Sequence, residues 1–120
     1  MKLWIDDVRP APGGDYKWPD NREYLWIKSV NQAKSTIESM EYFHNHPAFP
    51  PEELTIELID IDHDAGDYAI DGGDYIKLLD WLEETGRNYP IHIHSQNVVG
   101  RMNMRAIIER YCWTEIRRDF

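Results

Sequence analysis

Three short apolar segments of this chain each run directly into a group of polar side chains. In the printed sequence they are KLWI before DD, LTIELIDI before DHD, and IHIH before SQN. Apolar and β-branched runs of this length are typical of buried strands. In parallel sheets, ligands lie beyond the carboxyl ends of the strands. The sequence therefore predicts an α/β fold with one functional site at a sheet edge.

Hydrophobic periodicity predicts that strands and helices alternate along the chain. Asn31 is the expected N-cap of the first helix, and Gly86 is the expected stop of the helix that follows Asp71-Gly72-Gly73. A surface loop is expected at 15–23. The expected elements are strands at 2–5, 24–30, 54–61 and 91–94, helices from Asn31 to Phe43 and from Tyr75 to Gly86, a closing helix with Met104, Ile107, Ile108 and Tyr111 on its apolar face, and a short strand candidate at 113–116. This order implies a mostly parallel sheet with helices on its faces.

Composition limits the classes of protein to consider. The chain of 120 residues has the length of one domain, 1–120, and its hydrophobic fraction of 42% indicates a globular fold. A formal charge of -9 opposes extended binding to a nucleic-acid backbone or to an anionic membrane. No signal peptide or membrane span is recognisable, and Cys112 alone cannot form an internal disulfide. We therefore expect a cytoplasmic protein, with Cys112 in the core.

The carboxylates after the first and second segments predict a metal site. Asp6, Asp7 and Asp62, with Asp64 beside them, would repel one another if brought together, and a divalent cation such as Mg²⁺ relieves that repulsion. Mn²⁺ is the alternative ion. Each pair taken alone is more simply explained as turn formers or helix caps. The coincidence of two pairs with a third polar group favours the site.

Histidines beside these carboxylates are candidates for acid-base chemistry. Imidazole changes its charge near neutral pH, so His63 and His94 are candidate catalytic groups together with Asp62. Each could also be a metal ligand or a hydrogen-bonded structural residue. Strand alternation puts His92 on the same face as His94, but only His94 lies beside the polar turn. A structural role is therefore favoured for His92.

Three further residues are candidates for phosphate binding. Ser95 and Asn97 stand where the closing helix is expected to begin, and helix N-termini bind anions. Arg9 follows the first acidic pair and carries a guanidinium suited to bidentate phosphate contact. The alternatives are that Ser95 or Asn97 caps the helix and that Arg9 pairs with Asp7 or Asp64.

The motifs LWIDDVRPAP, IDIDHDAG and IHIHSQNVVGRMNM together resemble the cyclic-phosphate-processing receiver-like family, which is related to response-regulator receiver domains. The resemblance spans almost the whole chain. It implies a receiver-like (flavodoxin-like) three-layer sandwich with a mostly parallel sheet of four to five strands. It also implies that Asp6 and Asp7 form the metal-binding acidic pair, that Asp62 occupies the phosphoacceptor position with Asp60 as a rival, and that Ser95 takes the hydroxyl position.

A phosphorylated receiver uses a lysine on its last strand, yet the last lysine here is Lys77. This departure favours an enzyme over a phosphorelay switch. The expected function is a metal-dependent phosphoesterase acting on cyclic or terminal phosphates of nucleotides or RNA ends. The alternatives are a signalling module phosphorylated on Asp62 and a phosphate- or nucleotide-binding module without catalysis. The expected partner is a small phosphorylated substrate or a nucleic-acid end.

Overall fold

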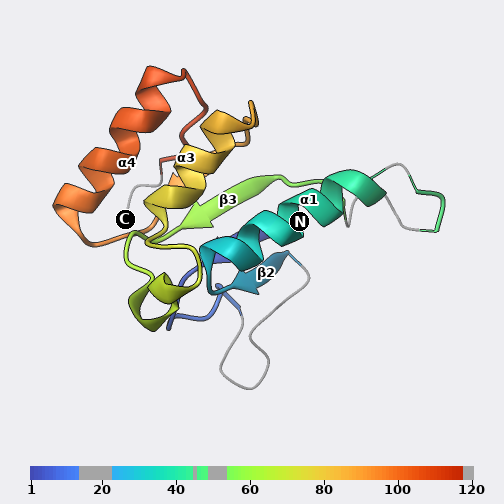
Figure 1. Ribbon diagram of the computed structural model, residues 1–120, viewed down its shortest axis with the longest axis horizontal. Coiled ribbons are helices and arrows are strands. Elements are labelled where there is room, and N and C mark those ends of the chain that lie inside the picture. The colour runs from blue at the N-terminus through green and yellow to red at the C-terminus, as the bar shows by residue number, and fades with distance from the viewer. Residues whose placement is uncertain (14–22, 45, 49–53, 118–120) are drawn as a thin grey trace.

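Strands and helices alternate in the computed structural model, which describes residues 1–13, 23–44, 46–48 and 54–117 (Figure 1). In chain order the elements are β1 Lys2–Ile5, β2 Tyr24–Ile27, α1 Val30–Phe43, β3 Leu58–Ile61, the 3₁₀ helix η1 Gly66–Ile70, α3 Ile76–Glu84, β4 Ile91–Ile93 and α4 Val98–Arg110. The alternation expected from periodicity is confirmed, while η1 was not predicted. None of the described helices is long and apolar enough to span a membrane.

The four strands form one parallel sheet in the order β2-β1-β3-β4. Ile5 of β1 pairs with Ile27 of β2 and with Ile61 of β3, and Ile61 pairs with Ile93 of β4. The carboxyl ends of the strands therefore lie at one level. This order is that of a receiver-like sheet, so the expected α/β fold is confirmed.

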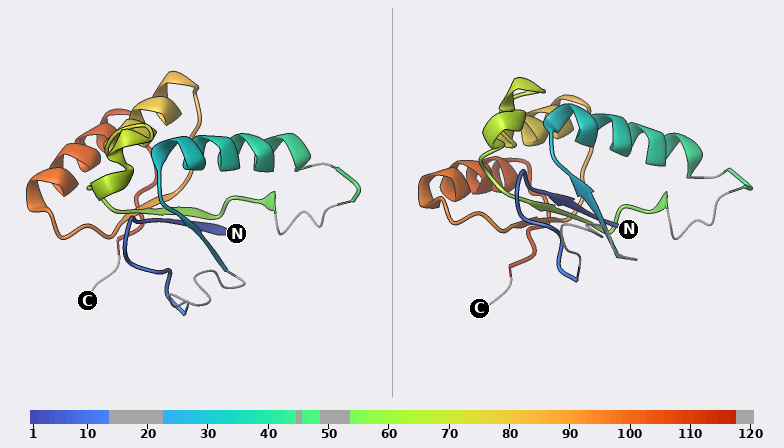
Figure 2. Two further views of the ribbon diagram at one scale, coloured as in Figure 1. Left: turned by 60° about the horizontal axis from the view of Figure 1, so that its bottom comes forward. Right: turned by 90° about the horizontal axis from the view of Figure 1, so that it is seen from below.

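Helices α1, α3 and α4 lie side by side on one face of the sheet (Figure 2). The connections from β2 to β3 and from β3 to β4 advance in the same direction, and right-handed crossovers that do so place their helices on the same face. The segments that follow β1 and α4 run along the other face. Within the described residues, the third layer of the expected sandwich consists of these segments and contains no helix.

Alternation along the strands gives the two faces of the sheet different chemistry. On the helical side, Leu3, Ile5, Ile59, Ile61, Ile91 and Ile93 join the helices in the main core. On the opposite side, Trp4 and Trp26 pack with Tyr24 and Ala11 in a second cluster. Burial of each large apolar side chain contributes about 1.5–3 kcal/mol. The helix-free face thus carries aromatic side chains on β1 and β2, and the polar residues Asp60 and His92 on β3 and β4.

The first helix begins earlier than predicted. Its N-cap is Ser29, whose Oγ accepts the backbone N–H of Gln32 at 3.0 Å, so the prediction of Asn31 as the cap is wrong. Asn31 lies inside the helix and donates to Asp71 at 3.1 Å. Ser29 Oγ also donates to Asp71, at 2.6 Å. This contact between distant segments fixes the Ser29 side chain in its capping position, and local sequence does not reveal it.

Other boundaries differ by a few residues. β2 ends at Ile27 and β3 begins at Leu58, so both strands are shorter than the predicted ranges 24–30 and 54–61. β4 ends one residue before His94. The strand candidate at 113–116 is reduced to a single parallel bridge between Glu115 and Ile91. Most of the loop predicted at 15–23 lies outside the described residues.

The expectation that Cys112 lies in the core is wrong. Cys112 is exposed and has a φ of 55°, just beyond the end of α4. The helix ends at Arg110, so Cys112 leaves the apolar stripe to which its spacing would assign it. The stripe itself is confirmed for Met104, Ile107 and Ile108, which are buried, whereas Tyr111 is partly exposed.

Candidate functional site

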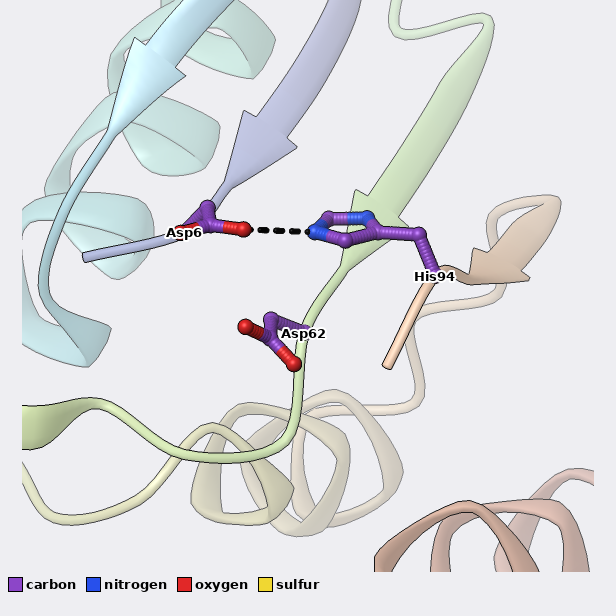
Figure 3. Close-up of side chains that lie close together, drawn as sticks. All are labelled: Asp6, Asp62 and His94. Carbon is purple, nitrogen blue, oxygen red and sulfur yellow. Dashed lines mark hydrogen bonds and ion pairs between the residues drawn. The ribbon is translucent and has the colours of Figure 1, made fainter. Parts of the chain in front are cut away.

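Asp6, Asp62 and His94 each follow a strand and meet at the same edge of the sheet (Figure 3). Their backbone N–H groups continue the sheet: Asp62 donates to Ile5 at 2.9 Å and His94 donates to Ile61 at 3.0 Å. One ligand atom from each of the three side chains lies within 4.8 Å of the others. The strand register therefore assembles this group, which we call the acid cluster.

His94 bridges two carboxylates through its two ring nitrogens. Its Nε2 lies 3.0 Å from Asp6 Oδ2, and its Nδ1 lies 2.8 Å from Asp60 Oδ1. Burial alone would lower the pKa of His94, but the hydrogen bonds and charges of the two aspartates outweigh burial and raise it. The arrangement favours a doubly protonated imidazolium that donates to both acids. A metal bound through Nε2 would have to displace a proton.

The two adjacent aspartates after β1 differ in their environments. Asp6 is buried, and burial alone would raise its pKa. Hydrogen bonds from His94 and from the backbone N–H groups of Arg9 and Val8 have the larger effect, so the pKa of Asp6 is lowered overall. Burial raises the pKa of Asp7, with smaller contributions from the charges of Asp6 and Asp62. Asp7 thus feels the mutual repulsion that a cation would relieve.

Gly66 allows Asp7 to approach the start of η1. A Cβ atom built on Gly66 would lie 2.3 Å from Asp7 Oδ2, and the φ of Gly66 is +56°. A side chain there would displace the carboxylate and would also strain the backbone. The carboxylate oxygens of Asp6 and Asp62, with the charged Asp7 nearby, are donors that fit a hard divalent cation, although Asp7 is not among the ligand atoms that lie within 4.8 Å of one another.

A second group of predicted residues lies beside the acid cluster. His63 Nδ1 lies 2.9 Å from Asp64 Oδ1, and Asn97 Nδ2 lies 3.5 Å from both His63 Nδ1 and Asp64 Oδ2. Asn97 caps α4 as expected, because its Oδ1 accepts the N–H of Gly100 at 2.9 Å. A Cβ on Gly100 would lie 2.4 Å from the His63 ring, so glycine is required for this packing. Asp64 thus orients His63 and does not join the group of Asp6, Asp62 and His94.

The remaining predicted residues, Arg9 and Ser95, line a cavity on the helix-free face. Ser95 is buried, and its Oγ accepts the N–H of Asn97 at 3.1 Å, so it supports the turn before α4. The Arg9 carbonyl accepts a hydrogen bond from Trp4 Nε1 at 2.7 Å. No ion pair joins Arg9 to Asp7 or Asp64.

Asp60 was not predicted as a partner of the site histidines, whereas His92 is buried and hydrogen-bonded, in agreement with the structural role favoured for it. Asp60 is fully buried, and its Oδ1 lies 2.8 Å from both His92 Nδ1 and His94 Nδ1. The sequence did contain a signal for this contact. Asp60 is a charged residue in the middle of an apolar strand, and His92 and His94 are spaced so that both rings lie on one face of the next strand. Asp60 lies within β3, whereas Asp62 directly follows β3 and lies with Asp6 and His94 at the sheet edge.

Trp4 is a further member of the site that sequence reasoning missed. Its ring stacks on His94 with centroids 3.8 Å apart and an interplanar angle of 2°. Strand alternation puts Trp4 on the same face as Asp60, His92 and His94, but it does not reveal that the rings of Trp4 and His94 stack. The stacked indole favours the charged form of His94 through its negative ring face.

Comparison with known proteins identifies the family of the chain. The family model described as the cyclic-phosphate processing receiver domain matches residues 1–110. Neither the curated proteins nor the solved structures gave a match. The family match covers β1 through α4, and so includes every candidate site residue described above. The chain belongs to the cyclic-phosphate processing receiver domain family.

Proposed function

We propose that this protein is a metal-dependent phosphoesterase that processes cyclic or terminal phosphates of nucleotides or RNA ends. The observation that carries the proposal is the meeting of Asp6, Asp62 and His94 at one sheet edge, in a family of cyclic-phosphate processing domains. Turn formation or helix capping alone would not require the acid cluster together with His63, which is oriented by its own carboxylate, Asp64. Metal binding and proton transfer are the chemistry that such a set performs.

In this proposal Asp6, Asp7 and Asp62 hold the divalent ion, Mg²⁺ or Mn²⁺. An ion held by these residues would supply polarisation of a phosphoryl oxygen or activation of a water molecule. The raised pKa of Asp7 supports this role, because it reflects crowding of negative charge that an ion would neutralise. Asp6 is held in place by two backbone N–H groups at 2.8 and 3.0 Å, so its geometry is set before any ion binds.

His63 is the better candidate for proton transfer. Both ring nitrogens of His94 contact carboxylates, so His94 positions Asp6 and Asp60. His63 has one such contact, from Nδ1 to Asp64, which leaves Nε2 to exchange a proton with substrate or water. A carboxylate on the opposite ring nitrogen fixes the tautomer needed for this role. Asn97, at the N-terminus of α4, supplies an amide for the phosphate beside this ring.

A phosphorelay role has one observation in its favour. Asp62 follows β3 next to Asp6, as a receiver phosphoacceptor would, and Ser95 follows β4. The lysine of a phosphorylated receiver has no equivalent after the last strand, since the last lysine in the sequence is Lys77 on α3. Stable, stoichiometric labelling of Asp62 by a small phosphodonor, without turnover, would support this alternative over the enzyme.

The test is turnover of defined substrates with added metal. Purified protein is incubated with 2′,3′-cyclic nucleotides, 3′,5′-cyclic nucleotides and nucleoside monophosphates in Mg²⁺, Mn²⁺ or EDTA, and products are separated by chromatography. We expect metal-dependent hydrolysis of at least one cyclic phosphate. Asp62→Asn should abolish it, and His63→Gln should slow it about 10²- to 10⁴-fold, the usual contribution of acid-base catalysis.

Asp80→Asn on α3 is the matched control, because it removes one carboxylate outside the site and should leave turnover unchanged. Absence of turnover with every substrate and metal would refute the enzyme proposal. Full activity in both Asp62→Asn and His63→Gln would do the same. Tight binding of a phosphate compound recovered unaltered would identify a binding module.

A further inference from the structure

A cavity of about 880 Å³ lies beside the edge strand β4, between the helix-free face of the sheet and α4. Its walls come from β1, from the segment after β1, from β4 and the turn after it, from α4, and from the chain beyond α4. The lining includes Trp4, Arg9, His92, His94, Gln96, Arg101, Arg105, Glu115 and Arg117. This volume lies within the range of about 300–1,000 Å³ that is typical of small-molecule sites. Asp6, Asp7 and Asp62 are not part of its lining.

The cavity is basic although the protein as a whole is strongly acidic. Four arginines and one glutamate line it, in a chain with a formal charge of -9. Glu115 accepts from Arg105 at 2.7 Å and from Arg117 at 3.0 Å, so one carboxylate serves two guanidinium groups. A local surplus of positive charge attracts small anions even when the chain as a whole is acidic.

Two of the cavity arginines are available for a ligand. Within the part of the chain that the structure describes, neither Arg9 nor Arg101 forms an ion pair. They reach the cavity from different elements, Arg9 from the segment after β1 and Arg101 from α4. Guanidinium groups bind phosphate oxygens through paired N–H donors, which is why arginine is common in phosphate sites. Gln96 adds a neutral amide to the same lining.

We propose that this cavity is an anion site for a small organic phosphate of nucleotide size, with the phosphate held by Arg9 and Arg101. The cavity shares His94 with the acid cluster, but its lining includes none of the carboxylates proposed to hold the metal. The proposal goes beyond the phosphoesterase function, since it concerns binding and does not require that the bound molecule be turned over.

The test measures binding by calorimetry in EDTA, where the acid cluster holds no metal and repels anions. The probes are adenosine 5′-monophosphate, inorganic phosphate and adenosine. We expect the monophosphate to bind, phosphate to bind more weakly, and adenosine to bind at least tenfold more weakly than the monophosphate. Binding should weaken as salt is added, because the contacts are ionic.

Three variants locate the site. Arg9→Gln and Arg101→Gln should each weaken binding of the monophosphate about tenfold or more, the usual effect of losing a charge-assisted contact. Arg110→Gln, on the same helix but outside the cavity lining, is the matched control and should bind as the parent does. Circular dichroism of each variant verifies that the fold is retained.

Several results would overturn the inference. Parent-like binding by both Arg9→Gln and Arg101→Gln would remove the proposed contacts. Binding that disappears in EDTA and returns with Mg²⁺ would assign the anion to the acid cluster. Equal affinity for inorganic phosphate and the monophosphate would refute a site of nucleotide size. None of these outcomes bears on turnover, so the phosphoesterase proposal is judged separately.

Discussion

The indole of Trp4 lies flat against the imidazole of His94, with ring centroids 3.8 Å apart. Trp4 also donates from Nε1 to the carbonyl of Arg9 at 2.7 Å. One side chain thus supports both the histidine that bridges two aspartates and the backbone of a cavity residue. A tryptophan in the middle of β1 is therefore part of the site as well as of the second aromatic cluster.

Replacing Trp4 tests this support. We expect Trp4→Leu to reduce the free energy of unfolding by about 2–3 kcal/mol, since a buried aromatic ring is lost. The pKa of His94 should fall, because the stacked ring no longer favours the imidazolium. Urea unfolding measures the first effect and NMR titration of the ring protons measures the second. Trp113→Leu, outside this stack, is the control whose His94 pKa should be unchanged.

His94 should make stability depend on pH. Its pKa is raised above the ordinary value of 6.5. The contribution of protonated His94 to the free energy of unfolding is therefore fully present below pH 6.5. It is lost as the pH rises through the higher pKa of His94 in the folded protein. We expect the parent to lose stability over that rise and His94→Gln to lack this component. Urea unfolding in EDTA at a series of pH values measures the difference, and parallel curves would contradict the bridging role.

Gly66 should be needed for Asp7 to reach its position. We expect Gly66→Ala to cost about 1–2 kcal/mol from the left-handed backbone alone, and to weaken Mg²⁺ binding because its Cβ would displace the Asp7 carboxylate. Gly86→Ala is the matched control: Gly86 has a φ of +69° with nothing within 4 Å of its Cβ position. Calorimetry should show weaker metal binding only in Gly66→Ala, although both variants lose stability.

Gly100→Ala separates helix formation from site geometry. Alanine inside a helix is ordinarily more favourable than glycine by about 1 kcal/mol. Here its Cβ would meet the His63 ring at 2.4 Å, so the ring must move away from Asp64 and Asn97. We expect helix content to be retained, the His63 ring resonances to shift, and any phosphoesterase rate to fall. An unshifted His63 spectrum would show that the ring tolerates the methyl group.

The cap of α1 can be tested by a pair of substitutions. Ser29→Ala should cost about 1 kcal/mol, because it removes the acceptor for the Gln32 N–H. Asn31→Ala removes an exposed contact to Asp71 and should change stability by less than about 0.5 kcal/mol. Thermal unfolding of both variants gives the comparison. A larger loss in Asn31→Ala would restore Asn31 as the important residue.

The sequence predicted the sheet-edge residues because parallel strands make their ends coincide. KLWI, LIDI and IHI are neighbouring parallel strands whose carboxyl ends lie at the same level. The residues that follow them, Asp6, Asp62 and His94, are therefore expected to lie close together. The alternation of apolar residues also predicted the apolar faces of the helices. These features depend only on local pattern and on the register of adjacent strands.

Contacts across the fold could not be read from local pattern. Ser29 became the cap of α1 because Asp71, far along the chain, binds its hydroxyl. Asp60 became the partner of His94 because the ring turns back over β3 after leaving β4. Cys112 is exposed, and not in the core as predicted, because α4 ends at Arg110. In each case a tertiary contact or a helix end decided the outcome, and residue spacing did not.

His94 is the one residue that belongs to both the acid cluster and the basic cavity. A metal ion in the acid cluster and an anion in the cavity would therefore both interact with the imidazole of His94. By thermodynamic linkage, if the metal changes the affinity for the anion by some factor, the anion changes the affinity for the metal by the same factor. Affinity for metal and affinity for anion could not then be tuned independently without replacing this histidine.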